Sequence, residues 1–260
     1  MSDKQISAKE YECKLPTVKR KIDYSTYEFY DKRLLSRLAG LLHRCVANIF
    51  LRAYLKIVYR VKVVGKKNLA AVKNTGAVVV SNHIHPLDIQ MISVFLFGMR
   101  KLNWLTLERN MQLSVHNLIK NSGGVPIPED RTQRKRCLSE MGELLRSGGL
   151  LLICPEGSLV EMCEDIRPFK DGAFRFSEEC KVPLLPVTLR FVKTAPSGRP
   201  YRHPRFIIDV AEAVPPAYPR DVIKRKAERI MLSRSTAFIH SMGESAAKRG
   251  FAANLFTKNS

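Results

Sequence analysis

Apolar residues recur along this chain of 260 residues in two alternating patterns. Short runs rich in β-branched and aliphatic residues have the composition of strands, and between them apolar residues return every three or four positions, as in helices. Strands that alternate with helices indicate crossover connections and a largely parallel sheet covered on both faces. We therefore predict an α/β fold: a mostly parallel sheet of about seven strands flanked by helices, with an amphipathic helical N-terminal attachment. The predicted strands are residues 60–64, 77–81, 102–107, 124–127, 150–154, 184–191 and 205–210, and the predicted helices are residues 87–97, 111–120, 134–145, 173–180 and 221–242.

Two segments are predicted before the main domain, which covers residues 60–260. Residues 1–25 are polar and basic without a hydrophobic period, so we expect a flexible basic arm. Residues 26–59 have a helical period, and we interpret them as an amphipathic membrane-docking segment. The same pattern fits a helix that packs its apolar face on the domain core, and the sequence leaves both interpretations open. The apolar face consists of Leu35, Leu38, Leu42, Cys45, Ile49 and Ala53, whereas Arg33, Arg37 and Arg44 fall on the opposite side.

The chain is strongly basic, with 44 Lys and Arg against 24 Asp and Glu and a formal net charge of +20. Half of this excess lies before position 68, where 16 basic residues stand against 6 acidic ones. Such a charge favours a polyanionic partner: nucleic acid, an anionic lipid surface or a phosphorylated substrate. No apolar run approaches the roughly 18–20 residues of a membrane-spanning helix, and we expect no secretory signal. The six cysteines form no Cys-x-x-Cys pair, which argues against a zinc site and favours reduced thiols in a cytosolic compartment.

A histidine and an aspartate follow the predicted strand over residues 77–81. The sequence there is Asn82-His83-Ile84-His85-Pro86-Leu87-Asp88, and a helix is predicted to begin at position 86 or 87. In open α/β sheets ligands bind at the carboxyl ends of the strands, where His83 would stand. A carboxylate on one ring nitrogen fixes the tautomer of an imidazole and stabilises the imidazolium that forms when it takes a proton. Taken alone, the spacing also fits a loop-capping His83 and an Asp88 that merely favours a helix N-terminus.

Further motifs follow this one in a characteristic order. They are Gly123-Gly124-Val125-Pro126-Ile127, Pro155-Glu156-Gly157-Ser158, the turn Phe169-Lys170-Asp171-Gly172, and Val182-Pro183-Leu184-Leu185-Pro186-Val187. With Asn-His-x4-Asp as the first block, the order and spacing resemble those of the lysophospholipid acyltransferase family, the 1-acylglycerol-3-phosphate acyltransferases and their relatives. The resemblance covers about residues 58–240 and implies that residues 60–260 form an acyltransferase domain.

Two blocks depart from the family pattern. The third normally reads Phe-Pro-Glu-Gly-Thr-Arg, and here Cys154, Ser158 and Leu159 replace the Phe, the Thr and the Arg. Ser158 keeps a hydroxyl, but Leu159 removes a charge that would support the site or touch phosphate. In the second block the family's Arg follows the strand within two or three residues, whereas here three residues intervene before Arg131. The phosphate-binding role is therefore assigned to Arg131 with Arg134 as an alternative, and the acceptor is left open to differ from lysophosphatidate.

The resemblance implies roles for particular residues. His83 is the general base and Asp88 orients it. Backbone N–H groups near Gly157 or in the loop after Asn82 are expected to stabilise the oxyanion. Cys154 is expected to be a packing residue, and Ser158 lacks a Gly-x-Ser-x-Gly elbow, so we expect direct transfer rather than an acyl-enzyme. Glu156 would touch the acceptor or support the site, and Lys170 is a cation candidate or a solvated turn lysine. The implied substrate-binding residues are Arg131, Glu156, Gly157, Ser158, Lys170 and Gly124, with no metal ligand.

Pattern and resemblance together predict a peripheral O-acyltransferase on the cytoplasmic side of a membrane. It would transfer a fatty acyl group from acyl-CoA or acyl-carrier protein, a co-substrate with no separate cofactor, to the hydroxyl of 1-acylglycerol-3-phosphate in phosphatidic acid synthesis. The alternative acceptors are another lyso-lipid, such as lyso-ornithine lipid, and glycerol-3-phosphate. A rival of another class is a non-catalytic basic protein that binds anionic lipid or nucleic acid. Because no helix-turn-helix, zinc finger or aromatic RNA-binding motif is present, we expect no nucleic-acid partner.

Overall fold

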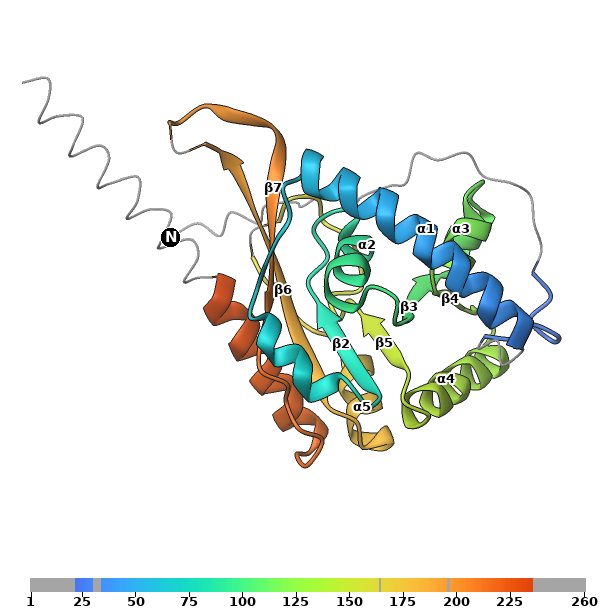
Figure 1. Cartoon of the computed structure of the whole chain (residues 1–260). Coiled ribbons are helices and arrows are strands. Elements are labelled where there is room, and N and C mark those ends of the chain that lie inside the picture. Colours follow the sequence, from blue (N-terminus) through green and yellow to red (C-terminus); the bar gives the residue numbers. More distant parts are fainter. Residues whose placement is uncertain (1–21, 30–33, 164, 196, 236–260) are drawn as a thin grey trace, which may run out of the picture.

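A computed structural model describes residues 22–29, 34–163, 165–195 and 197–235 of the chain. Over these residues a sheet of seven strands lies between two layers of helices (Figure 1). The strands are β1 (Lys62–Val64), β2 (Ala77–Ser81), β3 (Leu102–Leu107), β4 (Gly124–Ile127), β5 (Leu150–Ile153), β6 (Leu184–Thr194) and β7 (Pro200–Val210). The α-helices are α1 (Leu34–Val58), α2 (Asp88–Ile92), α3 (His116–Asn121), α4 (Arg131–Arg146) and α5 (Gly172–Cys180), with a last helix described over residues 220–235. The shorter turns are η1 (Lys66–Val72), η2 (Ser93–Phe97) and η3 (Glu108–Gln112).

The middle strand of the sheet is β2, because the strand order is β1-β7-β6-β2-β5-β3-β4. All neighbouring strands are parallel except β6 and β7, which form an antiparallel hairpin. The predicted α/β fold with a mostly parallel sheet of about seven strands is therefore confirmed. Every residue of β2 is buried, since helices cover both faces and neighbouring strands cover both edges. The chain that leaves β2 thus enters the centre of the sheet edge where ligands bind in such folds.

Alternate side chains of β2 enter two separate hydrophobic cores. Ala77 and Val79 contribute to the core that also contains side chains of α1, α2 and η2. Val78 and Val80 contribute to the core that contains side chains of α4, α5 and the last helix. Both faces of the sheet are therefore filled with apolar side chains, and polar chemistry is left to the strand ends.

Besides the unpredicted turn η1, the observed elements differ from the predicted ones in two places. β6 and β7 extend to Thr194 and back from Pro200, beyond their apolar runs, because the outer part of this hairpin is exposed and is held by its hydrogen-bond ladder. The helix predicted over residues 111–120 is divided into η3 and α3, with Leu113 in an extended conformation after η3. The extended backbone at Leu113 terminates η3, and α3 begins as a separate helix at His116.

Part of the predicted basic arm is packed on the domain. Tyr24 and Phe29 are buried in the core that contains α4. From α4, the Arg136 guanidinium donates hydrogen bonds to backbone carbonyl oxygens of this segment. The boundary placed after residue 25 is therefore corrected, since residues 22–29 form one folded segment; residues 1–21 lie outside the described residues.

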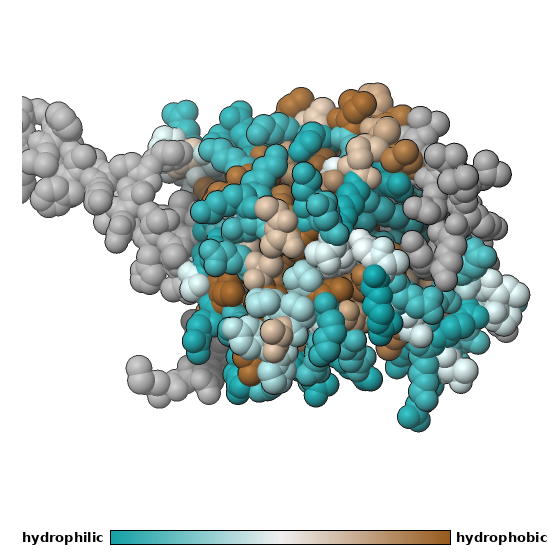
Figure 2. Space-filling model, turned by 60° about the horizontal axis from the view of Figure 1, so that its bottom comes forward, coloured by the Kyte–Doolittle hydropathy of each residue, from teal (hydrophilic) through white to brown (hydrophobic). Residues whose placement is uncertain are grey.

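The outward side of α1 is apolar. Ile49 is 69% exposed, whereas Leu55, on the other side of the helix, is fully buried. Of the side chains that the sequence pattern placed on the apolar face, Ile49 and Ala53 therefore point away from the protein, whereas Cys45 is half-buried. In Figure 2, brown side chains gather along the upper edge of the molecule, where the rotation carries α1. The exposed apolar face of α1 consists of Val46, Ile49, Phe50, Ala53 and Ile57.

Asn48 on the inward side of α1, and Arg52 at the edge between its two sides, seat the helix on η2 and the turn after it. Asn48 Nδ2 donates a hydrogen bond to the carbonyl oxygen of Gly98 at 2.8 Å. The Arg52 guanidinium lies over the Phe95 ring, 5.0 Å from its centroid. Burial lowers the pKa of the Arg44 guanidinium. Arg44 therefore lies on the side of the helix that the protein covers, opposite the exposed apolar face.

Candidate active site

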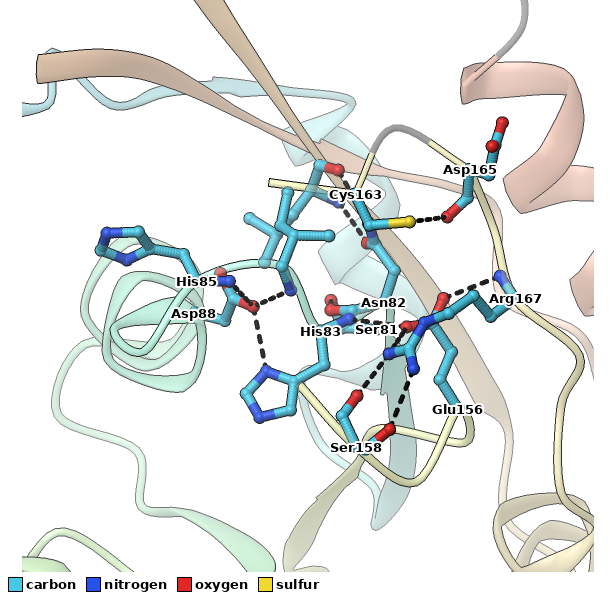
Figure 3. Close-up of polar contacts among 12 residues, drawn as sticks. Ser81, Asn82, His83, His85, Asp88, Glu156, Ser158, Cys163, Asp165 and Arg167 are labelled. Carbon is cyan, nitrogen blue, oxygen red and sulfur yellow. Dashed lines mark hydrogen bonds and ion pairs between the residues drawn. The ribbon is translucent and has the colours of Figure 1, made fainter. Parts of the chain in front are cut away.

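His83 and Asp88 meet at the carboxyl end of β2 (Figure 3). His83 comes two residues after the end of the strand, and Asp88 is the first residue of α2. His83 Nδ1 lies 3.1 Å from Asp88 Oδ2, and the side chain of His83 is 21% exposed while that of Asp88 is fully buried. A carboxylate only accepts hydrogen bonds, so Nδ1 donates and the lone pair stays on Nε2. The local fold thus brings together the two residues predicted as base and orienting carboxylate.

Asp88 also fixes the backbone next to His83. Its Oδ2 accepts hydrogen bonds from the N–H groups of Ile84 at 2.6 Å and His85 at 2.9 Å. Three donors around one buried carboxylate oxygen hold it in a single orientation. Asp88 Oδ1 is buried without a partner among the described residues. One side chain therefore orients both the imidazole and the loop from which it projects.

Asn82 holds the end of β2 against β6. Its Nδ2 donates to the carbonyl oxygen of Leu189 at 2.9 Å, and its Oδ1 accepts the N–H of the same residue at 2.8 Å. This buried amide continues the hydrogen-bond ladder for one residue beyond the strand. His83 therefore leaves the sheet from a fixed point.

Glu156 contacts the backbone of His83. It follows β5, which pairs with β2, and its side chain is only 1% exposed. Glu156 Oε2 accepts the N–H of His83 at 3.1 Å, and Oε1 accepts the N–H of Arg167 at 3.1 Å. Both carboxylate oxygens are therefore bound within the protein. This favours the second expected role of Glu156, support of the site, and its contact with the acceptor stays a prediction.

The counter-ion of Glu156 is Arg167, which no sequence pattern singles out. Arg167 Nη2 donates to Glu156 Oε2 at 2.7 Å and to the carbonyl oxygen of Ser158, while Nη1 donates to Ser158 Oγ at 3.0 Å (Figure 3). The Ser158 hydroxyl is thus bound to the arginine that pairs with Glu156. Arg167 has no motif spacing to Glu156, and the loop between them brings the two together. The one available signal was the absence of an arginine at Leu159.

Gly157 makes the turn after β5 possible. Its φ is 85°, in the left-handed region that favours glycine. A Cβ at this position would lie 2.5 Å from Lys170 Nζ and 2.8 Å from its Cε. The Lys170 side chain therefore lies against the glycine. The backbone N–H of Lys170 donates to the carbonyl oxygen of Pro155 at 2.8 Å. Gly157, Ser158 and Lys170 are brought to one turn next to Glu156.

Two predicted substrate-binding residues lie apart from this network. Gly124 is in β4, an edge strand three places from β2 and so about 14 Å away at the usual strand spacing. A Cβ there would lie 2.5 Å from Ile119 Cγ2, so Gly124 allows close packing, and its contact with substrate stays a prediction. Arg131 is exposed at the start of α4, and its contact with phosphate stays a prediction. The alternative, Arg134, donates from Nε to the carbonyl oxygen of Pro128 at 2.9 Å.

The backbone N–H groups expected to stabilise an oxyanion are already paired. Those of residues 83–85 donate to the two carboxylates of the site. That of Gly157 donates to the carbonyl oxygen of Cys154 at 3.1 Å. The expectation is therefore wrong for these four groups, because they hold the loops in place.

Cys154 has the character of a packing residue. Burial raises the pKa of its thiol well above the usual range, and the carboxylates of Asp88 and Glu156 act in the same direction. A thiol that stays protonated is a poor nucleophile, so the environment argues against a thiolate here. In the described part of the chain, no group of three or more His, Cys, Asp or Glu is placed to hold a metal ion.

Known proteins resemble this chain in sequence and in fold. Over 167 residues the chain is 30% identical to a 1-acyl-sn-glycerol-3-phosphate acyltransferase of Chlamydomonas reinhardtii; the match covers 61% of this chain and 48% of the relative, so the chain spans about half the length of the curated relative it matches. The crystal structure of PlsC, the 1-acyl-sn-glycerophosphate (LPA) acyltransferase of Thermotoga maritima, has a TM-score of 0.62 at 21% identity, over 81% of this chain and 84% of that one, a likeness of fold. The family model described as Acyltransferase matches residues 60–190, half of the chain, and these include both the His83–Asp88 and the Glu156–Arg167 pairs. The chain therefore belongs to the acyltransferase family.

Proposed function

We propose that this protein transfers a fatty acyl group from a thioester, acyl-CoA or acyl-carrier protein, to the free hydroxyl of 1-acylglycerol-3-phosphate, at the cytoplasmic surface of a membrane. The observation that carries the proposal is the His83–Asp88 pair at the carboxyl end of the central strand, with Nδ1 and Oδ2 3.1 Å apart. In this arrangement Nε2 is the basic atom and remains available to an acceptor hydroxyl.

The chemistry follows from these two residues. His83 Nε2 removes the hydroxyl proton while the acceptor oxygen attacks the thioester carbonyl carbon. The buried carboxylate of Asp88 stabilises the imidazolium formed in this step. The tetrahedral intermediate then expels the thiolate, which takes the proton from His83 as the carbon–sulfur bond breaks. The products are the new ester and a free thiol, the base is regenerated, and these steps call on no cofactor beyond the thioester co-substrate.

The choice of acceptor rests on the similarity to the Chlamydomonas relative, whose name gives 1-acyl-sn-glycerol-3-phosphate as substrate. A phosphate monoester also suits a chain with a net charge of +20. Arg131 is the candidate ligand for that phosphate, because it is exposed and Arg134 is occupied by a loop carbonyl. Another lyso-lipid and glycerol-3-phosphate remain the alternative acceptors.

The outward face of α1 supports docking on a membrane. Among the described helices none is both long and apolar enough to cross one. Ile49, Phe50 and Ile57 nevertheless present apolar side chains to the surroundings, and Arg52 and Lys56 lie exposed near this face. An apolar face flanked by cations suits the boundary between acyl chains and anionic headgroups. Each cation near such a surface contributes about 1 kcal/mol, so docking should weaken as salt screens it.

The test is an acceptor panel with the purified full chain. Labelled acyl-CoA or acyl-carrier protein is mixed with vesicles that contain lysophosphatidic acid, lyso-ornithine lipid or another lyso-lipid, or with glycerol-3-phosphate. Products are identified by mass spectrometry, and His83→Gln serves as the matched inactive protein. We expect phosphatidic acid from lysophosphatidic acid as the main product, with either donor or both.

Other outcomes of the panel are equally informative. Acylation of a different acceptor alone would assign one of the alternative substrates and contradict the proposed one. Binding to anionic vesicles without transfer to any acceptor would favour the non-catalytic lipid-binding protein. Equal transfer by wild type and His83→Gln would contradict the mechanism whatever the acceptor.

A further inference from the structure

Arg167 occupies the place where this chain lacks a charge. The third sequence block has Leu159 where the related pattern has an arginine, yet a guanidinium is present beside Glu156. It comes from the loop between β5 and α5, eight positions after Leu159. Through its two amino groups and its backbone N–H, Arg167 binds both Glu156 oxygens and both oxygens of Ser158. The pairing therefore closes this loop onto the turn that follows β5.

Glu156 links Arg167 to the backbone of His83, the proposed base. The same oxygen, Oε2, that accepts Arg167 Nη2 at 2.7 Å also accepts the backbone N–H of His83 at 3.1 Å. The Glu156 side chain is 1% exposed, so solvent cannot replace a lost partner. A buried carboxylate needs its counter-ion to stay charged and in place. The position of the His83 backbone thus depends on Arg167 indirectly, through Glu156.

We propose that Arg167 is a positioning residue for the base: it holds Glu156, and through Glu156 it fixes the backbone of His83. The inference rests on the proposed acyl transfer only in that His83 is taken as the base. Arg167 itself does not contact the acceptor in this proposal. Its side chain is 21% exposed, its Nε is buried without a partner among the described residues, and both amino groups are bound.

Kinetics separates positioning from substrate binding. Arg167→Gln should lower kcat by about 10- to 100-fold with little change in the KM for the acceptor, because a slightly misplaced base impairs the transition state more than binding. Arg167→Lys keeps the positive charge but not the bidentate contact, so its kcat should lie between those of Arg167→Gln and wild type. Arg175→Gln is the matched control, since Arg175 pairs with Glu179 in an exposed helical salt bridge and should keep wild-type kinetics. A rise in acceptor KM at unchanged kcat would overturn the proposal and make Arg167 a phosphate ligand.

A double-mutant cycle tests the route through Glu156. If Arg167 acts only by holding Glu156, the double variant Glu156→Gln/Arg167→Gln should have nearly the same kcat as Glu156→Gln alone. Removing both charges also leaves no unpaired buried ion, so the double variant remains interpretable if Arg167→Gln folds poorly. Losses that multiply in the double variant would show that Arg167 acts independently, against the proposal.

Hydrogen exchange gives a readout that needs no activity. Deuterium uptake of the peptide containing residues 82–88 is measured by mass spectrometry in wild type, Arg167→Gln and Arg175→Gln. The His83 amide should exchange about 10- to 100-fold faster in Arg167→Gln, because the Glu156 carboxylate that accepts its hydrogen bond is no longer held in place. In Arg175→Gln its exchange should be unchanged. Unchanged exchange in a folded Arg167→Gln protein would overturn the proposal. A wild-type protein that acylates no acceptor would count against the proposed function, while this measurement would still decide the role of Arg167.

Discussion

Replacing two exposed apolar residues of α1 should detach the protein from membranes without unfolding it. The change is the double variant Phe50→Ser/Ile57→Ser. Deleting the whole helix would be a poorer test, because Leu55 is fully buried in the domain core and its loss would leave a cavity. Substitutions on the outward face leave that contact intact.

The expected magnitude follows from the exposed fractions. Phe50 is 72% exposed and Ile57 is 74% exposed. Complete burial of such a side chain contributes about 1.5–3 kcal/mol, so insertion of the exposed part contributes about 1–2 kcal/mol for each. Losing both should reduce the free energy of membrane binding by about 2–4 kcal/mol. At about 1.4 kcal/mol per factor of ten, the partition coefficient falls about 30- to 700-fold. The free energy of unfolding should change little, as is usual at exposed positions.

The assay is co-sedimentation with anionic and with neutral vesicles over a range of lipid concentrations, with thermal melting in parallel. Leu138→Ser is the matched control, because Leu138 is an exposed leucine on α4, which packs on the opposite face of the sheet. This control should bind as wild type does. Wild-type partitioning of the Phe50→Ser/Ile57→Ser protein would refute the reasoning and place membrane binding on another surface. An equal loss in Leu138→Ser would point to a general hydrophobic effect and not to α1.

Three further outcomes are expected of the site. His83→Gln should reduce acyl transfer by about 10²–10⁴-fold with an unchanged circular dichroism spectrum, and Asp88→Asn should lose less; a folded His83→Gln enzyme with full activity would exclude the base mechanism. Arg131→Ala should raise the KM for a phosphorylated acceptor more than the KM for the thioester, since a contact made in both ground and transition states affects mainly binding; the reverse result, with Arg134→Ala raising the acceptor KM, would favour the alternative arginine. The raised pKa of the Cys154 thiol keeps it protonated at pH 8, so Cys154 should resist iodoacetamide and Cys154→Ala should keep its activity; rapid alkylation of Cys154 or loss of activity in the variant would contradict its role as packing.

The features that could be predicted from the sequence depend on residues close together in the chain. The run of buried apolar residues in β2 indicates a central strand wherever it occurs, because a strand covered on both faces has no polar side. His83 and Asp88 are separated by a single turn between that strand and α2, so their spacing alone brings the two side chains together. The pairing of His83 with Asp88 was therefore visible in the sequence.

The rest depended on contacts between segments that no spacing relates. A helical period shows that apolar residues share a face of α1, but not whether protein or solvent covers it; only the packing of Leu55 and Asn48 decides that Ile49 points outward. The pairing of Arg167 with Glu156 depends likewise on the path of the loop between them. The N–H groups after Asn82 looked free for an oxyanion in the sequence, and the tertiary fold binds them to two buried carboxylates. Sequence determined the local elements and the His83–Asp88 pair, because their contacts span one turn of chain. Tertiary structure decided the surroundings of that pair and the exposed face of α1, because those contacts join residues that meet only after the chain has folded.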